Sequence, residues 1–490
     1  MRIVYFDIDT LRADHVGCYG YERATTPNID AIAAEGIRFD NVYASDTPCL
    51  PSRTALSSGR FGTRSGVVGH GGTAADPRPE GAQRGFRSRA ATETWASLLQ
   101  RAGFWTASLS TFPERHSAFH FLAGFNEWHN LGTRGLETAD QVSALTLEWL
   151  SRHRGRSDWF LHVHFWDPHT PYRTPLSFGD PFAAAPTPVW LTEEVRAAHW
   201  MLPGPHSAQE MAGFGPRQVW DAYPRQPEVA NDMAAVRRMF DGYDTGVQYA
   251  DMHVGLILDA LKSQGVYDDT AVIVSSDHGE TLGELGVYCD HQTADHQVCR
   301  VPLVIRWPGV GPGATGRNSG LHYQFDAAAT VLELVGLEIP SRWDAKSFGA
   351  TFGSDRPDGR EHLVLTQGAW TAQRAVRFGE YISIHTYHDG FHGFPETMLF
   401  DLSEDPHEQH DLAASHGAEV RRAAALLESW LATQLRGQPM TADPLQAVLS
   451  EGGPWHARPG YQGYLRRLQE TGRARWATSA LGVPRNAQLE

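Results

Sequence analysis

The sequence predicts an α/β protein with a large mixed, mostly parallel sheet flanked by helices, followed by a small antiparallel sheet with one helix. Strand and helix patterns alternate up to about residue 358, whereas short strands separated by turns dominate from residue 359 onwards. Repeated alternation is typical of a parallel sheet covered on both faces. We therefore predict a large unit over residues 1–358, a small α+β unit over 359–436 and a C-terminal tail over 437–490.

The first elements establish the alternation. Residues 2–9, RIVYFDID, are β-branched and aromatic and end in carboxylates, as is typical of a buried strand whose carboxyl end opens into a site. A helix is predicted to follow Thr26, with Pro27 at its first position and a stop at Gly36. Residues 37–43 alternate between apolar and polar side chains, which predicts a second strand.

The same alternation continues along the chain. It recurs in TWASLLQRAGFWTASLS, in ALTLEWLSRHR before DWFLHVHFWD, and in VGLILDALKSQGVYDDTAVIVSSDHGE, where residues 271–274 form the predicted strand. Residues 175–231 lack periodicity and are rich in Pro, Trp, Gly and His. Because so many aromatic side chains favour burial, we predict an ordered excursion over the site rather than a disordered linker.

The C-terminal part of the sequence changes in character. HLVLTQG, RAVRFGEYISIHTY and ETMLFDLSEDP predict short strands, and AEVRRAAALLESWLATQL predicts the helix of the small unit. The segment GGPWHARPGYQGYLRRLQETGRARW is aromatic and basic. It suits a tail packed on the body of the protein or on a neighbouring subunit, and we expect a homo-oligomer.

Composition excludes several classes of function. The 490 residues include four cysteines (Cys18, Cys49, Cys289 and Cys299) and no CxxC pair, so we expect reduced thiols rather than a disulfide scaffold or a structural zinc site. A formal net charge of −15 argues against nucleic acid as a partner. No segment approaches the roughly 20 apolar residues that cross a bilayer. The first residues lack a signal-peptide pattern, so we expect a cytoplasmic protein without membrane contact.

The stretch PCLPSRTALSSGR indicates an anion site. Pro51 suits the first position of a helix and Gly59 supplies a left-handed stop, so Cys49 is predicted to lie just outside the helix N-terminus. Free amide groups and the positive end of the helix dipole favour anions there. Arg53 and Arg60 add cationic donors. A small buried structural cysteine is the alternative interpretation of Cys49.

The same stretch carries a family resemblance. CLPSRTALSSGR resembles the C-x-P-S-R-x-x-x-x-x-G-R signature of type I sulfatases of the alkaline phosphatase superfamily. The resemblance implies that a formylglycine-generating maturation enzyme oxidises Cys49 to an aldehyde, which is hydrated to a gem-diol. One hydroxyl attacks the sulfur of a small anionic ester, and the other loses its proton so that sulfate leaves by elimination. Cys49 and Arg53 are thus implied as catalytic residues.

The resemblance also implies a divalent metal. Sulfatases hold it with carboxylates after the first strand and in a distant Ser-Asp-His/Asn-Gly segment, which correspond here to Asp9, Asp277 and His278, with the modified Cys49 beside them. Oxygen ligands with one imidazole suit Ca²⁺, Mn²⁺ or Mg²⁺. The expected cofactors are therefore one such ion and the formylglycine derived from Cys49.

One departure from the family pattern follows Asp9. Many sulfatases have two adjacent aspartates there, whereas this chain has Thr10, as in the phosphonate monoester hydrolase branch. Asp7 shares a strand face with Asp9 and could compensate. A structurally paired carboxylate is the alternative interpretation of Asp7.

Further residues are implied in substrate contact. DPHTPY resembles the family's D-P-H-x-P-Y segment, which makes His169 the histidine that contacts substrate and protonates the leaving oxygen. His291 stands where relatives place a substrate-binding lysine, which would make binding pH-dependent. His70 lies where relatives have a polar residue near the leaving group, and a turn histidine is the alternative. STFPERH replaces the family's Gly-Lys-x-His segment, so Ser110 or Thr111 is expected to contact substrate.

The resemblance covers most of the chain. MLFDLSEDPHEQHDLA resembles the LYDLxxDPxExxNLA strand and turn of the family's small domain, so the likeness runs from residue 1 to about residue 435. It implies an alkaline-phosphatase-like large sheet and a small four-stranded antiparallel sheet with one helix. This agrees with the fold that the alternation of elements predicts.

Four functions compete on these grounds. A sulfatase is the first hypothesis. A phosphonate monoester or phosphodiester hydrolase built on the same site is the second, because Thr10, the missing lysine and the cytoplasmic setting resemble that branch. A zinc hydrolase is the third, because His162 and His164 alternate on one strand face, although burial with polar partners is the alternative for this pair. A binding protein for sulfated ligands, with Cys49 never modified, is the fourth.

Overall fold

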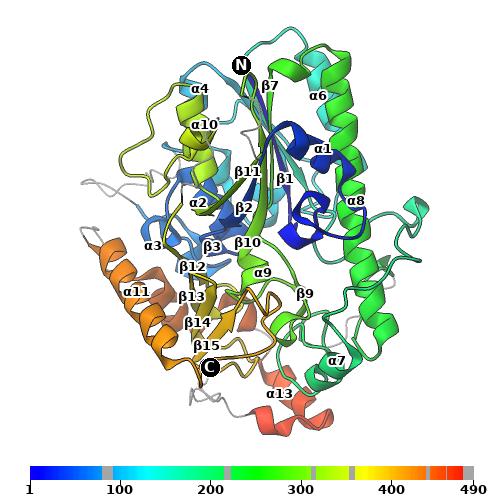
Figure 1. Ribbon diagram of the computed structural model, residues 1–490, viewed down its shortest axis with the longest axis vertical. Coiled ribbons are helices and arrows are strands. Elements are labelled where there is room, and N and C mark those ends of the chain that lie inside the picture. Colours follow the sequence, from blue (N-terminus) through cyan, green and yellow to red (C-terminus); the bar gives the residue numbers. More distant parts are fainter. Residues whose placement is uncertain are drawn as a thin grey trace.

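The computed structural model of the protein describes residues 1–79, 92–214, 222–310, 316–352, 359–436, 442–458 and 461–477. A large sheet lies at its centre, with helices on both faces and a smaller sheet below it (Figure 1). In spatial order the large sheet contains β11 (Arg317–Tyr323), β2 (Ile37–Tyr43), β10 (Arg300–Arg306), β7 (Thr270–Ser275), β1 (Arg2–Ile8), β6 (Trp159–Phe165), β4 (Trp105–Leu109) and β5 (Glu127–His129).

The large sheet is mixed and mostly parallel, which confirms the predicted fold class. β10 runs antiparallel to both of its neighbours, β7 and β2, and the other pairs are parallel. Because β4, β6, β1 and β7 run in the same direction, their carboxyl ends meet at one edge of the sheet. The segments after these strands carry the polar residues of the predicted site.

Two apolar cores hold the helices against the two faces of this sheet. Successive strand residues point to opposite faces; in β1, Ile3 and Tyr5 join one core and Val4 and Phe6 join the other. The first core includes residues of α2 (Cys49–Ser58), α4 (Trp95–Arg101) and α10 (Asp326–Leu334), and the second includes residues of α1 (Pro27–Glu35), α6 (Ala139–Arg152) and α8 (Met233–Ser263). Helices therefore cover both faces, as expected.

The smaller sheet contains one strand more than the sequence predicts. Its order is β15 (Thr397–Asp401), β14 (Tyr381–His388), β13 (Ala372–Phe378), β12 (His362–Gln367) and β3 (Asp46–Thr47), and α11 (Gly417–Leu435) packs on it. The four C-terminal strands are antiparallel, whereas β3 pairs in parallel with β12. Because β3 directly precedes Pro48 and Cys49, it ties the small sheet to the start of α2.

The described part of the C-terminal tail packs on the body of the same chain. It contains α12 (Pro444–Ser450) and α13 (Tyr461–Glu470). Leu445 and Val448 join a small core with Val68 and Ala372. Arg374, only 1% exposed, forms a bidentate ion pair with Asp443 at 2.6 and 2.7 Å. Packing on the body of the same chain is one of the two positions that the sequence predicts for the tail. The homo-oligomer stays a prediction.

The excursion over residues 175–231 contains α7 (Glu193–His199), and its residues 215–221 lie outside the described part of the chain. Near its end, Gln226 accepts a hydrogen bond from Thr170 at 2.8 Å. Within the described residues, no helix is long and apolar enough to cross a membrane.

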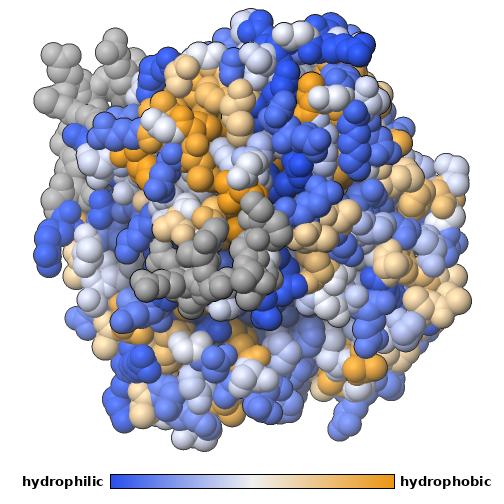
Figure 2. Space-filling view, turned by 45° about the horizontal axis from the view of Figure 1, so that its top comes forward, coloured by the Kyte–Doolittle hydropathy of each residue, from blue (hydrophilic) through white to orange (hydrophobic). Residues whose placement is uncertain are grey.

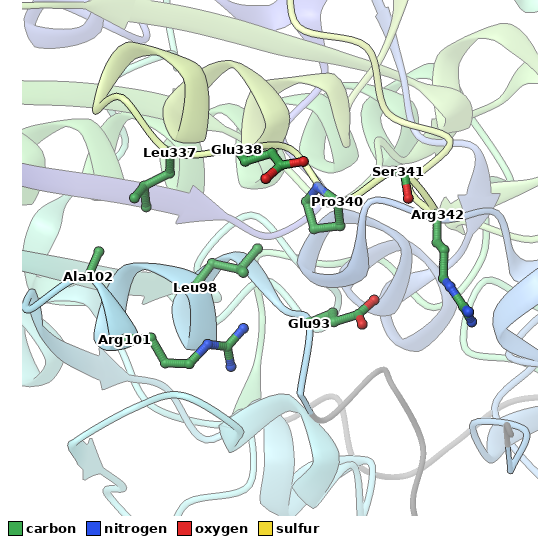
Figure 3. A pocket seen from close by; sticks show the side chains of 9 residues that line it. All are labelled: Glu93, Leu98, Arg101, Ala102, Leu337, Glu338, Pro340, Ser341 and Arg342. Atoms are coloured by element: carbon green, nitrogen blue, oxygen red, sulfur yellow. The ribbon is translucent and has the colours of Figure 1, made fainter.

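One surface pocket lies away from the predicted site residues. Hydrophobic side chains gather on the upper left of the face shown in Figure 2, on the side where α4 and α10 lie in Figure 1. A pocket of about 600 Å³ between α4 and the segment after α10 is lined by Leu98, Leu337, Arg101 and Arg342, among others (Figure 3). None of the predicted site residues lines it.

Candidate active site

Four of the predicted site residues meet at the carboxyl edge of the large sheet. Asp9 follows β1, Asp277 and His278 follow β7, and Cys49 begins α2. One ligand atom from each of the four lies within 4.8 Å of the others, and all four side chains are buried. The sequence places these residues far apart, but the parallel strands bring them together because their carboxyl ends share one edge.

Cys49 is the first residue of α2 rather than a residue outside it. Pro48 is the N-cap, and Gly59 ends the helix with φ +63°, as predicted. The Sγ atom of Cys49 lies 3.2 Å from Nε2 of His278. Burial raises the pKa of the Cys49 thiol well above its usual value, and the nearby carboxylates of Asp9 and Asp277 add to this rise. The unmodified side chain is therefore a neutral thiol and a poor nucleophile.

Arg53 connects the carboxylates of the site. Its Nε donates to Asp7 at 2.9 Å, its Nη2 donates to Asp9 at 3.0 Å, and its Nη1 donates to Asp277. The side chain is 1% exposed. One guanidinium thus faces three buried carboxyl groups. Its single positive charge cannot balance three carboxylates if all of them are ionised.

The pKa values reflect this shortage of positive charge. Burial alone would raise the pKa of Asp9, but Arg53 and then His169 hold it well below its usual range. Burial raises the pKa of Asp277 well above its usual value, and Asp9 and Asp7 reinforce the rise against Arg53. The Oδ1 atom of Asp9 is buried without a hydrogen-bond partner among the described residues. A divalent cation would supply the missing charge and a partner for this oxygen, so the residues present fit one.

The contacts of Asp7 and of the His162–His164 pair bear on their open interpretations. Asp7 accepts from Arg53 and lies 3.3 Å from His162, and it stands outside the cluster of Asp9, Cys49, Asp277 and His278, which favours a paired carboxylate. His164 accepts from Arg53 at 2.7 Å and shares a hydrogen bond with Ser110 at 2.8 Å. Among the described residues, no cluster with metal-ligand geometry includes any of these three residues. Burial with polar partners is therefore the better interpretation of the histidine pair than a zinc site.

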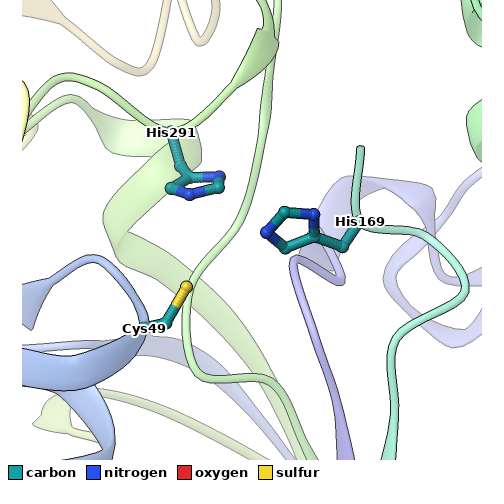
Figure 4. A group of neighbouring side chains, drawn as sticks. All are labelled: Cys49, His169 and His291. Atoms are coloured by element: carbon teal, nitrogen blue, oxygen red, sulfur yellow. The ribbon is translucent and has the colours of Figure 1, made fainter. Parts of the chain in front are cut away.

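Two more predicted residues face Cys49. The ligand atoms of Cys49, His169 and His291 lie within 4.8 Å of one another, and Figure 4 shows both rings directed toward the cysteine. Nδ1 of His169 donates to the carbonyl oxygen of Thr170, which leaves Nε2 for the site. Burial lowers the pKa of His169 well below its usual value, and burial with His278 and His169 does the same for His291. Both rings are therefore uncharged at neutral pH without a ligand.

His70 and Thr111 have other partners. Nε2 of His70 accepts from the backbone N–H of Leu50 at 3.3 Å, and its Nδ1 lies 2.9 Å from Nε2 of His456. Thr111 donates to Glu137 at 2.6 Å and is 1% exposed. The structure therefore brings the His70 ring next to the nucleophile position, but it directs the Thr111 hydroxyl to a carboxylate.

Several residues near the site are absent from the sequence-based prediction. His456 comes from the tail, its ring stacks on Trp370 with centroids 4.8 Å apart, and His116 lies 4.7 Å from His70. Arg115 lies with its guanidinium 4.9 Å from the ring of Trp166. No periodicity marks these residues, although His116 and Arg115 stand in the STFPERH segment that replaces the family's lysine motif.

Comparison with known proteins agrees with the geometry. The family model described as Sulfatase matches residues 2–337, and the model described as N-sulphoglucosamine sulphohydrolase, C-terminal, matches residues 283–433. The choline-sulfatase of Rhizobium meliloti is 28% identical over 442 residues, which cover 81% of this chain and 79% of that protein. Arylsulfatase A of Homo sapiens is 24% identical over 505 residues, covering 92% and 91%.

Solved structures share the fold. The phosphonate monoester hydrolase of Agrobacterium radiobacter has a TM-score of 0.68 at 21% identity, with 88% of this chain and 96% of that chain covered. A protein bound to its substrate D-glucosamine-2-N,6-O-disulfate has a TM-score of 0.71 at 20% identity, with 89% and 99% covered. The Sulfatase match spans more than half of the sequence, and the chain belongs to the sulfatase family of the alkaline phosphatase superfamily, a family of sulfuric ester hydrolases.

Proposed function

We propose that this chain hydrolyses sulfate monoesters through a formylglycine made from Cys49 and one divalent metal ion, Ca²⁺, Mn²⁺ or Mg²⁺. The observation that carries the proposal is the buried cluster of Asp9, Cys49, Asp277 and His278, whose ligand atoms lie within 4.8 Å of one another. Its position at the carboxyl ends of parallel strands is typical of active sites in α/β folds.

The side chains of Asp9, Asp277 and His278 would hold the ion, beside the modified Cys49. When bound, the ion would polarise the sulfate group and stabilise the charge that develops on its oxygens. Arg53 lowers the pKa of Asp9 and so keeps this carboxylate ionised, which is the form that binds a metal ion. The buried, unpartnered Oδ1 of Asp9 supports this assignment.

The Sγ atom of Cys49 stands in for the oxygen of the aldehyde. When present and hydrated, the aldehyde supplies one nucleophilic hydroxyl and a second hydroxyl whose deprotonation expels sulfate. Nε2 of His278 lies 3.2 Å from this position, and Nδ1 donates to the carbonyl oxygen of Gly279, so Nε2 is the nitrogen that would hold the ion beside the modified residue. The position is the first residue of α2, where the positive end of the helix dipole favours an anion. An unmodified thiol has no second hydroxyl and would not supply this exit, which favours the modified form.

His169 and His291 would orient the ester, and His169 would donate a proton to the leaving oxygen. Nε2 of His169 faces the Cys49 side chain, and an ester anion bound beside it would raise the pKa of the imidazole. Protonated in this way, His169 can act as the general acid for the leaving oxygen. His291 would contact a sulfate oxygen. The side-chain polar atoms of Thr111 and His70 already have protein partners. We therefore propose that these two residues contact the substrate only through backbone or ring atoms.

Hydrolysis of phosphonate monoesters or phosphodiesters on the same site is the second candidate. Thr10 favours it, because this position adds no second carboxylate to the cluster; the Thr10 hydroxyl is buried without a partner among the described residues, and its N–H donates to Asp277 at 3.3 Å. Phosphonate monoester hydrolases of similar fold support this alternative. A cytoplasmic location and a formylglycine-generating enzyme as partner remain part of the proposal.

The test compares matched aryl esters on one enzyme preparation. We expect kcat/KM for 4-nitrophenyl sulfate to exceed that for 4-nitrophenyl phenylphosphonate, and both activities to vanish in Cys49→Ala. The His162→Ala variant serves as control for the zinc hypothesis, since it should retain its metal. A higher kcat/KM for the phosphonate would favour the second candidate, and turnover by Cys49→Ala would refute both.

A further inference from the structure

The C-terminal tail holds a loop that lies beside the nucleophile position. Residues 451–456 of the tail, which we call the tail clasp, contact the loop of residues 70–73 at both of its ends. At the far end of the loop, the carboxylate of Glu451 accepts from the backbone N–H of Thr73 at 3.1 Å. The clasp lies beyond residue 433, where the family match ends, so no matched family pattern covers it.

Two glycines of the loop allow the clasp to approach closely. A Cβ atom at Gly71 would lie 2.1 Å from the ring of Trp455, and a Cβ atom at Gly72 would lie 2.0 Å from the carboxylate of Glu451. Gly72 also has φ +67°, a conformation that favours glycine. A larger residue at either position would push the tail away, so the loop and the clasp fit each other.

The near end of the loop is held by a pair of histidines. The backbone N–H of Leu50, the residue after Cys49, donates to Nε2 of His70 at 3.3 Å. Because that nitrogen accepts, the neutral His70 ring carries its proton on Nδ1, which donates to Nε2 of His456 at 2.9 Å. Burial lowers the pKa of His456 to about 4, so its ring is neutral near pH 7 and its Nε2 can accept. His456 therefore selects the tautomer of His70.

Contacts outside the loop fix the ring of His456 in place. Its backbone N–H donates to the carbonyl oxygen of Ala369 at 3.1 Å, and its ring stacks on Trp370 with centroids 4.8 Å apart. The turn before it is closed by Arg458, whose Nε donates to the carbonyl oxygen of Gly453 at 2.7 Å. The acceptor for His70 is thus anchored by the small sheet and by the tail itself.

The tautomer of His70 matters at the start of α2. The N–H of Leu50 is one of the first N–H groups of this helix, which have no partner within the helix, and Cys49 begins the same helix. In the other tautomer Nε2 of His70 would carry a proton, two donors would face each other, and the ring would have to turn away. A shift of a reacting group by about 1 Å can lower a rate about 100-fold.

We infer that His456 is a positioning residue for the reaction at Cys49: by accepting from Nδ1 of His70, it keeps the His70 ring as an acceptor for the first turn of α2. The C-terminal tail is therefore part of the framework of the active site. His456 acts through His70 and contacts neither the ester nor the nucleophile. The effect on turnover rests on the proposed function, whereas the tautomer of His70 does not depend on it.

Two variants separate the hydrogen bond from packing. His456→Phe keeps a flat ring on Trp370 but offers no acceptor, whereas His456→Gln offers an amide oxygen near the position of Nε2. Arg467→Met is the matched control, since it weakens another tail contact while Glu210 keeps its pair with Arg473. With 4-nitrophenyl sulfate, we expect kcat to fall about tenfold in His456→Phe, the effect of one buried donor left unpaired. It should stay within about threefold of wild type in His456→Gln and within about twofold in Arg467→Met.

A second measurement reads the tautomer of His70 without any turnover. In protein with unmodified Cys49 and isotope-labelled histidine, the NMR shift of the ring Cδ2 atom distinguishes the two neutral tautomers. The spectrum of His70→Ala identifies the signal of His70. We expect the tautomer with the proton on Nδ1 in wild type and in His456→Gln, and a change toward the tautomer with the proton on Nε2 in His456→Phe.

Several results would overturn the inference. An unchanged kcat in His456→Phe would show that the contact has no role in the reaction. Equal losses in His456→Phe and His456→Gln, or an equal loss in Arg467→Met, would indicate packing alone, and an unchanged His70 tautomer in His456→Phe would remove the physical basis. If wild type turns over no sulfate ester but the tautomer changes as expected, the proposed function fails and the hold of the tail clasp on His70 stands.

Discussion

Replacing Arg53 with methionine tests the charge balance of the site. The substitution keeps an unbranched apolar stem but removes the guanidinium that pairs with Asp7, Asp9 and Asp277. Breaking a buried ion pair by removing one partner costs about 3–5 kcal/mol, because the other charge stays buried and unpaired. Arg53 is 1% exposed, so water cannot replace it. We expect the free energy of unfolding to fall by this amount when a chelator removes divalent ions.

We also expect the loss of stability in Arg53→Met to depend on divalent ions, which distinguishes this site from other buried ion pairs. Without Arg53 the cluster carries one positive charge fewer, so a divalent ion binds it more tightly and stabilises the folded state more than in wild type. The matched control is Arg374→Met, which breaks an equally buried pair with Asp443 in the small sheet. Urea denaturation of the three proteins, with chelator and with Mn²⁺ or Ca²⁺, measures the effect. Equal metal-induced gains in Arg53→Met and Arg374→Met would refute the reasoning.

Three further predictions concern single residues of the site and its surroundings. Asp277→Asn should reduce bound metal from about one equivalent to less than about a tenth, because an anionic oxygen ligand is lost; unchanged metal content in elemental analysis would contradict this. Burial raises the pKa of Asp46 to about 6, so the folded protein binds an extra proton and loses stability as the pH rises from about 4 to about 6. Asp46→Asn should therefore be more stable than wild type at pH 8, by up to about 3 kcal/mol, in chemical denaturation, and an equal or lower stability would argue against it. Thr10 has φ +58°, a conformation that aspartate tolerates better than threonine, so Thr10→Asp should fold and bind the divalent ion more tightly in a metal titration; weaker binding would contradict a metal at this cluster.

The residues at strand ends were the most predictable part of the site. Asp9, Asp277 and His278 each follow a buried apolar strand, and parallel strands bring their carboxyl ends to one edge. The helix after Cys49 could be predicted from Gly59 and Pro51, although its first residue is Cys49 itself. Local patterns of one or two residues, together with one topological rule, are enough for these positions.

Other parts depend on contacts that no local pattern contains. The sequence could not decide whether Asp7 binds metal or pairs, because the answer depends on where the side chain of Arg53 points. β3 has two residues, too few for a periodic signal, and its pairing with β12 joins segments far apart in the chain. His456 is 386 residues from His70, so its position beside the site depends on how the tail packs.

The central claim is the aldehyde at Cys49, and one measurement tests it most directly. Trypsin releases the peptide of residues 39–53, which begins after Arg38 and ends at Arg53. Mass spectrometry of this peptide, from active protein made with a formylglycine-generating enzyme, should give a mass about 18 Da below that of the thiol form, the difference between a CH₂SH and a CHO side chain. An unmodified peptide from protein that turns over sulfate esters would contradict the account.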